Sequence, residues 1–176
     1  EFKRFRSTLA NTGASLKAVL LTHAHIDHVL GLPSVLDAFD LDVYLNHADL
    51  APWNNIEQQA SMFGMKAVRL NVEPKPLPGD TSFSMGQFDM DVKYTPGHAP
   101  DHVSLYFPNE GILIAGDTLF KDSVGRSDLY KGDPHLLKDS IKKKLYSLPD
   151  DTIVYPGHGP ETTIGHEKRF NPFVKG

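Results

Sequence analysis

Short apolar runs alternate along the chain with amphipathic stretches, and turn residues separate them. Such runs are typical of strands, and the amphipathic stretches are typical of surface helices. Strands are predicted at residues 18–21, 42–45, 66–70, 81–84, 87–95, 102–107, 111–115 and 152–154. Helices are predicted at residues 2–15, 31–39, 47–63, 133–147 and 163–170, and the proline-rich residues 73–80 are predicted to form a loop. This alternation predicts a layered α/β domain.

The segment that follows the first predicted strand carries the strongest chemical signal. It reads His23-Ala24-His25-Ile26-Asp27-His28. In an extended segment, His23 and His25 project from the same side because they lie two residues apart. Asp27 and His28 come where a helix could begin, so they can point towards a neighbouring position. One segment can therefore supply ligands to two adjacent metal ions.

Three later strands end in the same way. Their last residues are followed by Gly97-His98, Gly116-Asp117 and Gly157-His158. In each case a glycine permits an unusual backbone angle, and a side chain suited to metal binding then stands at the end of the strand. Four strand ends with such side chains predict one site along one edge of a sheet sandwich.

These motifs resemble those of the metallo-β-lactamase superfamily, and within it those of the small hydroxyacylglutathione hydrolase-like (glyoxalase II-like) enzymes of bacteria. The matching segments are residues 23–28, 95–98, 116–120, 125–128 and 155–159. The resemblance implies an αββα sandwich with a two-metal hydrolytic site. It also implies the ligands: His23, His25 and His98 for one metal, Asp27, His28 and His158 for the other, and Asp117 as a bridge between them.

The ligand types define the chemistry. Imidazole and carboxylate groups suit zinc, iron or manganese, and zinc is the expected metal. Two such ions about 3.5–4 Å apart can share a water molecule and lower its pKa from 15.7 to about 7. Asp27 and Asp117 are the predicted catalytic residues, since Asp27 would also orient the shared hydroxide. The resemblance to glyoxalase II-like enzymes further implies the hydrolysis of a thioester such as S-lactoylglutathione.

Composition sets the remaining limits. With 176 residues, the chain is long enough for one domain with a sizeable core, and residues 1–176 are predicted to form it. The net charge of −4 argues against a general nucleic-acid surface. No apolar run approaches the roughly 20 residues of a membrane span. The absence of cysteine is compatible with a reducing cytosol, so a cytoplasmic location is expected, and the oligomeric state stays open.

Two departures from the resemblance concern the ends of the chain. Relatives begin with several strands before the first helix, and none precedes residues 2–15 here. The expected sandwich therefore lacks its first strands, which would leave a sheet edge exposed. The helical region that helps glyoxalase II to hold glutathione is also not seen before Gly176.

Two other functions stay open at this stage. Persulfide dioxygenases of the same superfamily use one iron, held by residues that correspond to His23, His98 and Asp117. The alternative without catalysis is a truncated domain that binds metal but cannot organise a substrate. β-Lactamases of the superfamily carry cysteine or serine in place of Asp117, which argues against that activity.

Several polar residues need no role in metal binding. His47, His135 and His166 lie near the starts of predicted helices and are expected to cap them or to face solvent. His102 enters a strand close to His98, and a contact with a metal ligand is left open. Arg126 and Asp128 are expected to form an ion pair that braces the loop after Asp117.

Overall fold

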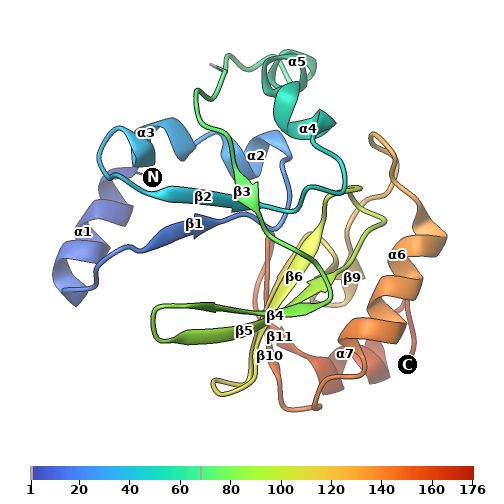
Figure 1. Cartoon of the computed structure of the whole chain (residues 1–176). Helices are drawn as coiled ribbons and strands as arrows, with labels where there is room; N and C mark the ends of the chain where they lie inside the picture. Colours follow the sequence, from blue (N-terminus) through green and yellow to red (C-terminus); the bar gives the residue numbers. More distant parts are fainter. Residues whose placement is uncertain (1, 68) are drawn as a thin grey trace.

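Two β-sheets form the centre of the molecule (Figure 1). The computed structural model describes residues 2–67 and 69–176. The smaller sheet is parallel and has the order β1 (Ala18–Leu20), β2 (Asp42–Leu45) and β3 (Lys75–Pro76). The larger sheet has the order β11 (Thr162–Thr163), β10 (Ile153–Pro156), β7 (Ile112–Gly116), β6 (Val103–Phe107), β5 (Phe88–Tyr94) and β4 (Thr81–Met85). A short ribbon pairs β8 (Leu119–Phe120) with β9 (Ser123–Val124).

Helices cover the outer face of each sheet (Figure 1). The smaller sheet carries α2 (Ile26–Val29), α3 (Leu32–Leu36), α4 (Ala51–Asn54) and α5 (Ile56–Met62). The larger sheet carries α6 (Pro134–Ser140), which continues into the π-helix η1 (Ile141–Leu145), and α7 (Ile164–Phe170). The remaining helix, α1 (Phe2–Thr12), contacts Phe39 through Phe5. This layering is the predicted αββα metallo-β-lactamase sandwich.

Alternating side chains of the strands fill the layers between these elements. On β2, Val43 and Leu45 pack under the helices, whereas Tyr44 faces the space between the sheets. On β7, Leu113 packs under α6 and α7, and Ile114 faces the space between the sheets. Because side chains of a strand point alternately to its two faces, each central strand contributes to both layers. The layers between the sheets and the helices and the layer between the two sheets are therefore all apolar.

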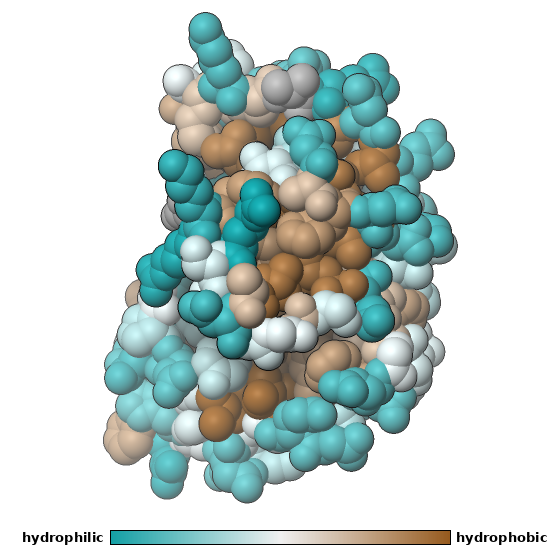
Figure 2. Space-filling view, turned by 90° about the vertical axis from the view of Figure 1, so that its left-hand side faces the viewer, coloured by the Kyte–Doolittle hydropathy of each residue, from teal (hydrophilic) through white to brown (hydrophobic). Residues whose placement is uncertain are grey.

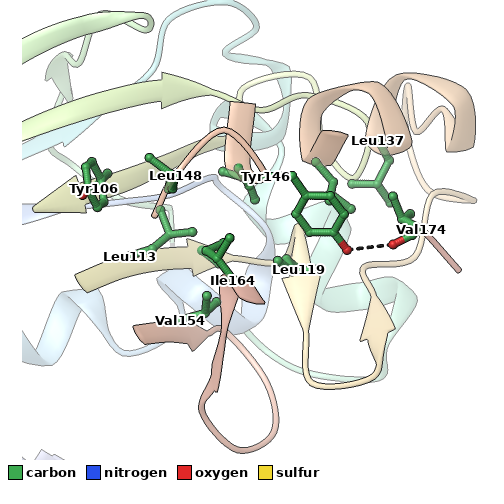
Figure 3. Close-up of a cluster of buried hydrophobic side chains, with 12 residues drawn as sticks. Tyr106, Leu113, Leu119, Leu137, Tyr146, Leu148, Val154, Ile164 and Val174 are labelled. Carbon is green, nitrogen blue, oxygen red and sulfur yellow. Dashed lines mark hydrogen bonds between the residues drawn. The ribbon is translucent and has the colours of Figure 1, made fainter. Parts of the chain in front are cut away.

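The cluster under α6, η1 and α7 fixes the end of the chain (Figure 3). Leu137, Leu145 and Ile164 are fully or almost fully buried there. The hydroxyl of Tyr146 donates a hydrogen bond to the carbonyl oxygen of Val174 across 2.7 Å. This bond satisfies a polar group that would otherwise be buried without a partner. It anchors the segment after α7 to the helical layer.

One predicted strand is wrong. Of residues 66–70, Val68 lies outside the described residues, and the other four form no strand. Their apolar side chains instead pack against the helices over the smaller sheet. The third strand is β3, inside the proline-rich stretch that was predicted to be a loop. An edge position tolerates Pro76, which has no N–H to donate, and the backbone N–H of Leu77 then bonds to Leu45.

The helix predicted at residues 47–63 is also interrupted. Residues 47 and 48 form a turn, residues 49 and 50 have no regular structure, and the side chain of Asp49 accepts a hydrogen bond from the N–H of Ala51 where α4 begins. A second break comes at Asn55, whose φ of −116° and ψ of 28° lie outside the helical range. The helix predicted at residues 31–39 is shorter than expected, since α3 spans Leu32–Leu36. Helix α7 and the hairpin of β6 and β7 lie where the sequence predicts them.

Strand β1 lies at the edge of the smaller sheet, and β2 is its partner there. All three of its residues are half-buried. Figure 2 looks onto the side of the molecule that carries α1 in Figure 1, and hydrophobic residues gather in the middle of this face. Among the described residues, the helices are too short or too polar to cross a membrane.

Candidate metal centre

The end of β1 delivers the first group of polar side chains. The N–H of Leu21 bonds to Tyr44 of β2, and the carbonyl oxygen of Thr22 accepts a hydrogen bond from the N–H of Val103 of the larger sheet. The chain therefore joins the two sheets immediately before His23. Residues 23–25 continue as a loop, and Asp27 and His28 lie in the first turn of α2, as the sequence predicts.

All seven residues predicted to bind metal come together in two neighbouring groups. The first group is formed by His23, His25 and His98, which are all buried. The second consists of Asp27, His28, Asp117 and His158. Within each group, one potential ligand atom of every residue lies within 4.8 Å of those of the others. A His/Asp cluster suited to binding metal is therefore present, built from four separate strand ends.

Asp117 lies between the two groups. One of its carboxylate oxygens, Oδ2, lies 3.6 Å from Nε2 of His98 in the first group and 3.4 Å from Nε2 of His158 in the second. The other oxygen, Oδ1, lies 3.3 Å from Nε2 of His28. The carboxylate thus faces both groups at once. This is the position that a bridging ligand requires.

Hydrogen bonds orient the ring of His98. Its Nδ1 lies 2.7 Å from the carbonyl oxygen of Arg126, which can only accept a hydrogen bond. In the neutral ring, Nδ1 therefore carries the proton, and the lone pair of Nε2 points into the cluster. Nε2 of His98 lies 3.2 Å from Nε2 of His23. A hydrogen bond from the other ring nitrogen to a backbone carbonyl commonly sets the tautomer of a metal-binding histidine.

Unpaired buried atoms show that the cluster suits cations. Nε2 of His28 and Oδ1 of Asp117 are buried without a hydrogen-bond partner in the part of the chain that the structure describes. Such groups are rare in folded proteins, because an unpaired buried polar group is costly. Asp117 lines a cavity of about 560 Å³, together with His25, Asp27, His98 and His158. Nitrogen and oxygen atoms that converge on one cavity fit a metal site.

The glycines next to the ligands confirm part of the predicted geometry. Gly97 and Gly116 have φ angles of 126° and 54°, in the region that glycine adopts most readily. Gly157 does not have such an angle, so the expectation is wrong there. A glycine is needed at position 157 for lack of space instead. A Cβ atom there would collide with Oδ1 of Asp117 and lie 3.0 Å from Cε1 of His28.

Burial keeps the first group of imidazoles neutral. It lowers the pKa of His25 to about 4, and the neighbouring His98 adds to this effect. Burial also holds the pKa of His23 well below its usual range and lowers the pKa of His98. Neutral imidazoles are the form that binds metal, so these three need not lose a proton at neutral pH.

The second group is more polar. Burial opposes ionisation of both His28 and Asp117, but each is stabilised by the other. The adjacent carboxylate raises the pKa of His28, and the imidazole at the same contact lowers the pKa of Asp117. Asp27 and His158 stand at the exposed side of the group, with 2.9 Å between Oδ2 and Nε2. This side opens to solvent and to the cavity.

His102 supports Asp117 from behind, a contact that the sequence left open. Nε2 of His102 accepts a hydrogen bond from the N–H of Asp117 across 3.0 Å, so Nδ1 carries the ring's proton. Nδ1 lies 2.9 Å from Oγ1 of Thr95, which in turn lies 2.9 Å from Oγ of Ser104. The Ser104 hydroxyl donates to the carbonyl oxygen of Ala115. This buried chain returns to the strand that carries Asp117.

Asp101 is a site residue that the sequence analysis missed. It is fully buried, and its Oδ2 accepts a hydrogen bond of 2.9 Å from the N–H of Ala24, between His23 and His25. Burial raises the pKa of Asp101 to about 7. Its place in the motif His98-Ala-Pro-Asp101 gives no signal of this role, because only the fold brings it to Ala24. Asp101 thus holds the backbone of the first ligand loop.

The remaining polar residues behave mostly as expected. Arg126 and Asp128 form the predicted ion pair, with distances of 2.7 and 2.8 Å, and both side chains are exposed. His47 lies 2.9 Å from the carbonyl oxygen of Pro74, and His135 is exposed. His166 is not simply solvated, because its Nε2 lies 2.7 Å from Oδ1 of Asp122.

Comparison with known proteins agrees with this geometry. The model of the family described as the metallo-beta-lactamase superfamily matches residues 4–158. The chain belongs to this superfamily. It is 37% identical over 181 residues to a probable metallo-hydrolase, YqgX, of Bacillus subtilis, covering 100% of this chain and 84% of the relative. It is 32% identical over 176 residues to the hydroxyacylglutathione hydrolase GloC of Haemophilus influenzae, covering 99% and 83%.

Two solved structures share the fold closely. TTHA1623 in a di-iron-bound form has a TM-score of 0.89 and 40% sequence identity, covering 99% of this chain and 85% of that one. The B3 metallo-β-lactamase BLEG-1 has a TM-score of 0.91 and 38% identity, covering 99% and 84%. The activities of these similar proteins differ, since one is a hydroxyacylglutathione hydrolase and another is a B3 metallo-β-lactamase. The relatives that are hydrolases, together with the His/Asp cluster, indicate a metal-dependent hydrolase and leave its substrate open.

Proposed function

We propose that this protein is a binuclear metal-dependent hydrolase of the glyoxalase II type, which cleaves thioesters. The observation that carries the proposal is the position of Asp117 between two groups of ligands, with its carboxylate facing both. A site for one metal would need only one of these groups. The similarity to a hydroxyacylglutathione hydrolase supports a thioester as the substrate.

Each residue of the cluster then has a role. In this proposal His23, His25 and His98 hold one metal, whereas Asp27, His28 and His158 hold the other, and Asp117 binds both. When bound, the two ions supply Lewis acidity that activates water as a nucleophile and stabilises the oxyanion of the attacked carbonyl. We propose zinc as the metal. Iron is the alternative, because the similar TTHA1623 structure is di-iron-bound.

The protein's own groups prepare the site for this reaction. The backbone of Arg126 holds the ring of His98, and His102 holds the backbone of Asp117. Asp27 is about half exposed and lines the cavity, so its carboxylate can accept a hydrogen bond from the attacking water. With a volume of about 560 Å³, the cavity is large enough to hold a carbonyl group with substituents on both sides. The proposal needs no serine or cysteine nucleophile.

The test combines metal analysis with hydrolysis of S-lactoylglutathione on one preparation. We expect about two metal ions per chain, together with turnover. Asp117→Ala should reduce both the metal content and the turnover, because it removes the group shared by the two sites. Asp139→Ala is the matched control, since it removes an exposed aspartate whose partner is Lys143. Full metal content and full activity in Asp117→Ala would refute the bridging role.

Two other activities give different results in the same experiment. One iron per chain, no hydrolysis and oxygen uptake with glutathione persulfide would identify a dioxygenase. Hydrolysis of a β-lactam in place of the thioester would follow the similarity to BLEG-1. Bound metal without any of these activities would support a domain that binds metal but cannot organise a substrate.

A further inference from the structure

A second cavity opens beside the metal centre, with a volume of about 420 Å³. It lies between α4 and α5 on one side and the loop after β9 on the other, in the upper part of Figure 1. Its walls include Pro52, Met62, Phe63 and Tyr130. His25, Gln59, Phe63 and Leu129 line this cavity and the metal cavity alike, so the two cavities adjoin one another. We call the second cavity the side groove.

The surface of the side groove is mainly apolar, with the side-chain amides of Asn55, Gln58 and Gln59 as its neutral polar groups. Among the described residues, no Asp, Glu, Lys or Arg lines it. Met62 and Phe63, which are adjacent in the sequence, leave 72% and 53% of their surface exposed, so the side groove presents apolar side chains to solvent. The cations near its rim are already paired. Lys131 lies 2.6 Å from Oδ2 of Asp49, and Arg126 is held by both oxygens of Asp128.

Hydrogen bonds hold the two walls in place. The side-chain amide of Gln59 donates to the carbonyl oxygens of Ala24 and Pro52, at 3.0 and 2.7 Å, and so ties α5 to the first ligand loop. On the opposite wall, Tyr130 and Lys131 both reach the carboxylate of Asp49, immediately before α4. The side groove is therefore formed before any ligand binds, which lowers the entropic cost of binding.

From these features we propose that the side groove binds an uncharged, apolar arm of the substrate, either an alkyl chain or an aromatic ring. The inference rests on the proposed thioester hydrolysis and specifies its substrate class. The reacting carbonyl would lie in the metal cavity, and the arm would extend past Phe63 towards Met62. Glutathione carries carboxylates and an ammonium group, and the side groove offers no charged partner for them. Its apolar walls match a neutral hydrocarbon arm instead.

Simple thioesters test the proposal directly. Methyl thioacetate serves as the reference, methyl thiohexanoate carries the arm on the acyl side, and hexyl thioacetate carries it on the thiol side. A buried methylene group contributes about fourfold to binding. We expect at least one of the long thioesters to have a kcat/KM at least tenfold above the reference. S-Lactoylglutathione is measured on the same metal-loaded preparation.

Met62→Asp places a charge inside the side groove and should lower the ratio of long to short thioester at least fivefold. The matched control is Phe88→Asp at the start of β5, which replaces another exposed apolar residue and should leave the ratio unchanged. Equal values for long and short thioesters, or an unchanged ratio in Met62→Asp, would overturn the proposal. Hydrolysis of S-lactoylglutathione alone would also overturn it while supporting the proposed function.

A binding measurement separates this proposal from thioester hydrolysis itself. N-Hexylacetamide is uncharged and is not a thioester, and N-methylacetamide is its short control. We expect the hexyl compound to shift the methyl resonance of Met62, but not those of Met85 and Met90, which pack between the sheets. Such a shift without any thioester turnover would support the side groove as a binding site for an apolar arm and would refute the proposed function. No shift of the Met62 signal would refute the side groove as a binding site.

Discussion

His102 and Asp117 are joined by a hydrogen bond in which the backbone N–H of Asp117 donates to Nε2 of the buried imidazole, 3.0 Å away. Replacement of His102 by leucine would leave this N–H without its partner. An unpaired buried group costs about 1–3 kcal/mol, and loss of a supporting contact typically lowers metal affinity about 10- to 100-fold. We therefore expect His102→Leu to bind metal more weakly, as measured by competition with a chelator.

The conservative variant His102→Gln tests whether the hydrogen bond is the cause. A glutamine carbonyl oxygen can accept from the N–H of Asp117, so this variant should recover part of the lost affinity. Both variants disturb the contact with Thr95, so the difference between them reports on the hydrogen bond to Asp117. If His102→Leu bound metal as tightly as the wild type, the support of Asp117 by His102 would be irrelevant to the site.

Gly157 leaves room for the second group of ligands. Gly157→Ala would place a Cβ atom against Oδ1 of Asp117 and 3.0 Å from Cε1 of His28. We expect this variant to lose metal from the second group while it remains folded, because its backbone angle suits alanine. Elemental analysis and circular dichroism measure the two effects. Gly31→Ala is the control, since a Cβ atom there meets no atom within 4 Å, and it should keep all its metal.

Removal of metal should lower the stability of the whole chain. A ligand that binds only the folded state stabilises it by about 2.7 kcal/mol when it is present at 100 times its Kd. In a domain of this size, 1 kcal/mol corresponds to a change of about 2–4 °C in Tm. We expect a chelator to lower Tm by roughly 5–10 °C, and added zinc to restore it. An identical Tm with and without chelator would show that the cluster holds no metal in solution.

The positions of the ligands could be predicted from the sequence because each follows a strand. Short apolar runs mark the strands, and the residues after them must lie along the edge of a sheet. His23, His98, Asp117 and His158 share this pattern, and the structure places them together. The prediction of a strand at residues 66–70 was wrong because the apolar side chains there pack against helices. Short apolar runs do not distinguish these two environments.

Other parts of the site depend on contacts between distant residues. Asp101 reaches Ala24 across 77 positions of the chain, and Lys131 reaches Asp49 across 82. No local pattern of the sequence announces either contact. The side groove has the same origin, since its walls come from α4, α5 and the loop that contains Leu129. Each metal ligand is thus marked by a local pattern of the sequence. The shape of the cavity around the ligands is not, because it depends on contacts between distant residues.

Asp101 should make stability depend on pH in the metal-free protein. Burial raises its pKa in the folded state to about 7, from an ordinary value of 3.8. The folded state therefore holds this proton more tightly than the unfolded state does. The resulting stabilisation is complete below about pH 4 and is lost as the pH rises through 7. Above that pH, the ionised side chain is buried, and its Oδ1 has no hydrogen-bond partner among residues 2–67 and 69–176.

Asp101→Asn removes this titration and keeps an oxygen that can accept the hydrogen bond from Ala24. Relative to the wild type, the variant should gain stability as the pH rises from 4 to 8, by an amount on the order of a few kcal/mol at most. The difference in the free energy of unfolding between the two proteins, measured with urea at each pH in the presence of a chelator, isolates Asp101 from the other carboxylates. A difference that does not change with pH would mean that Asp101 ionises in the folded protein at its ordinary pKa.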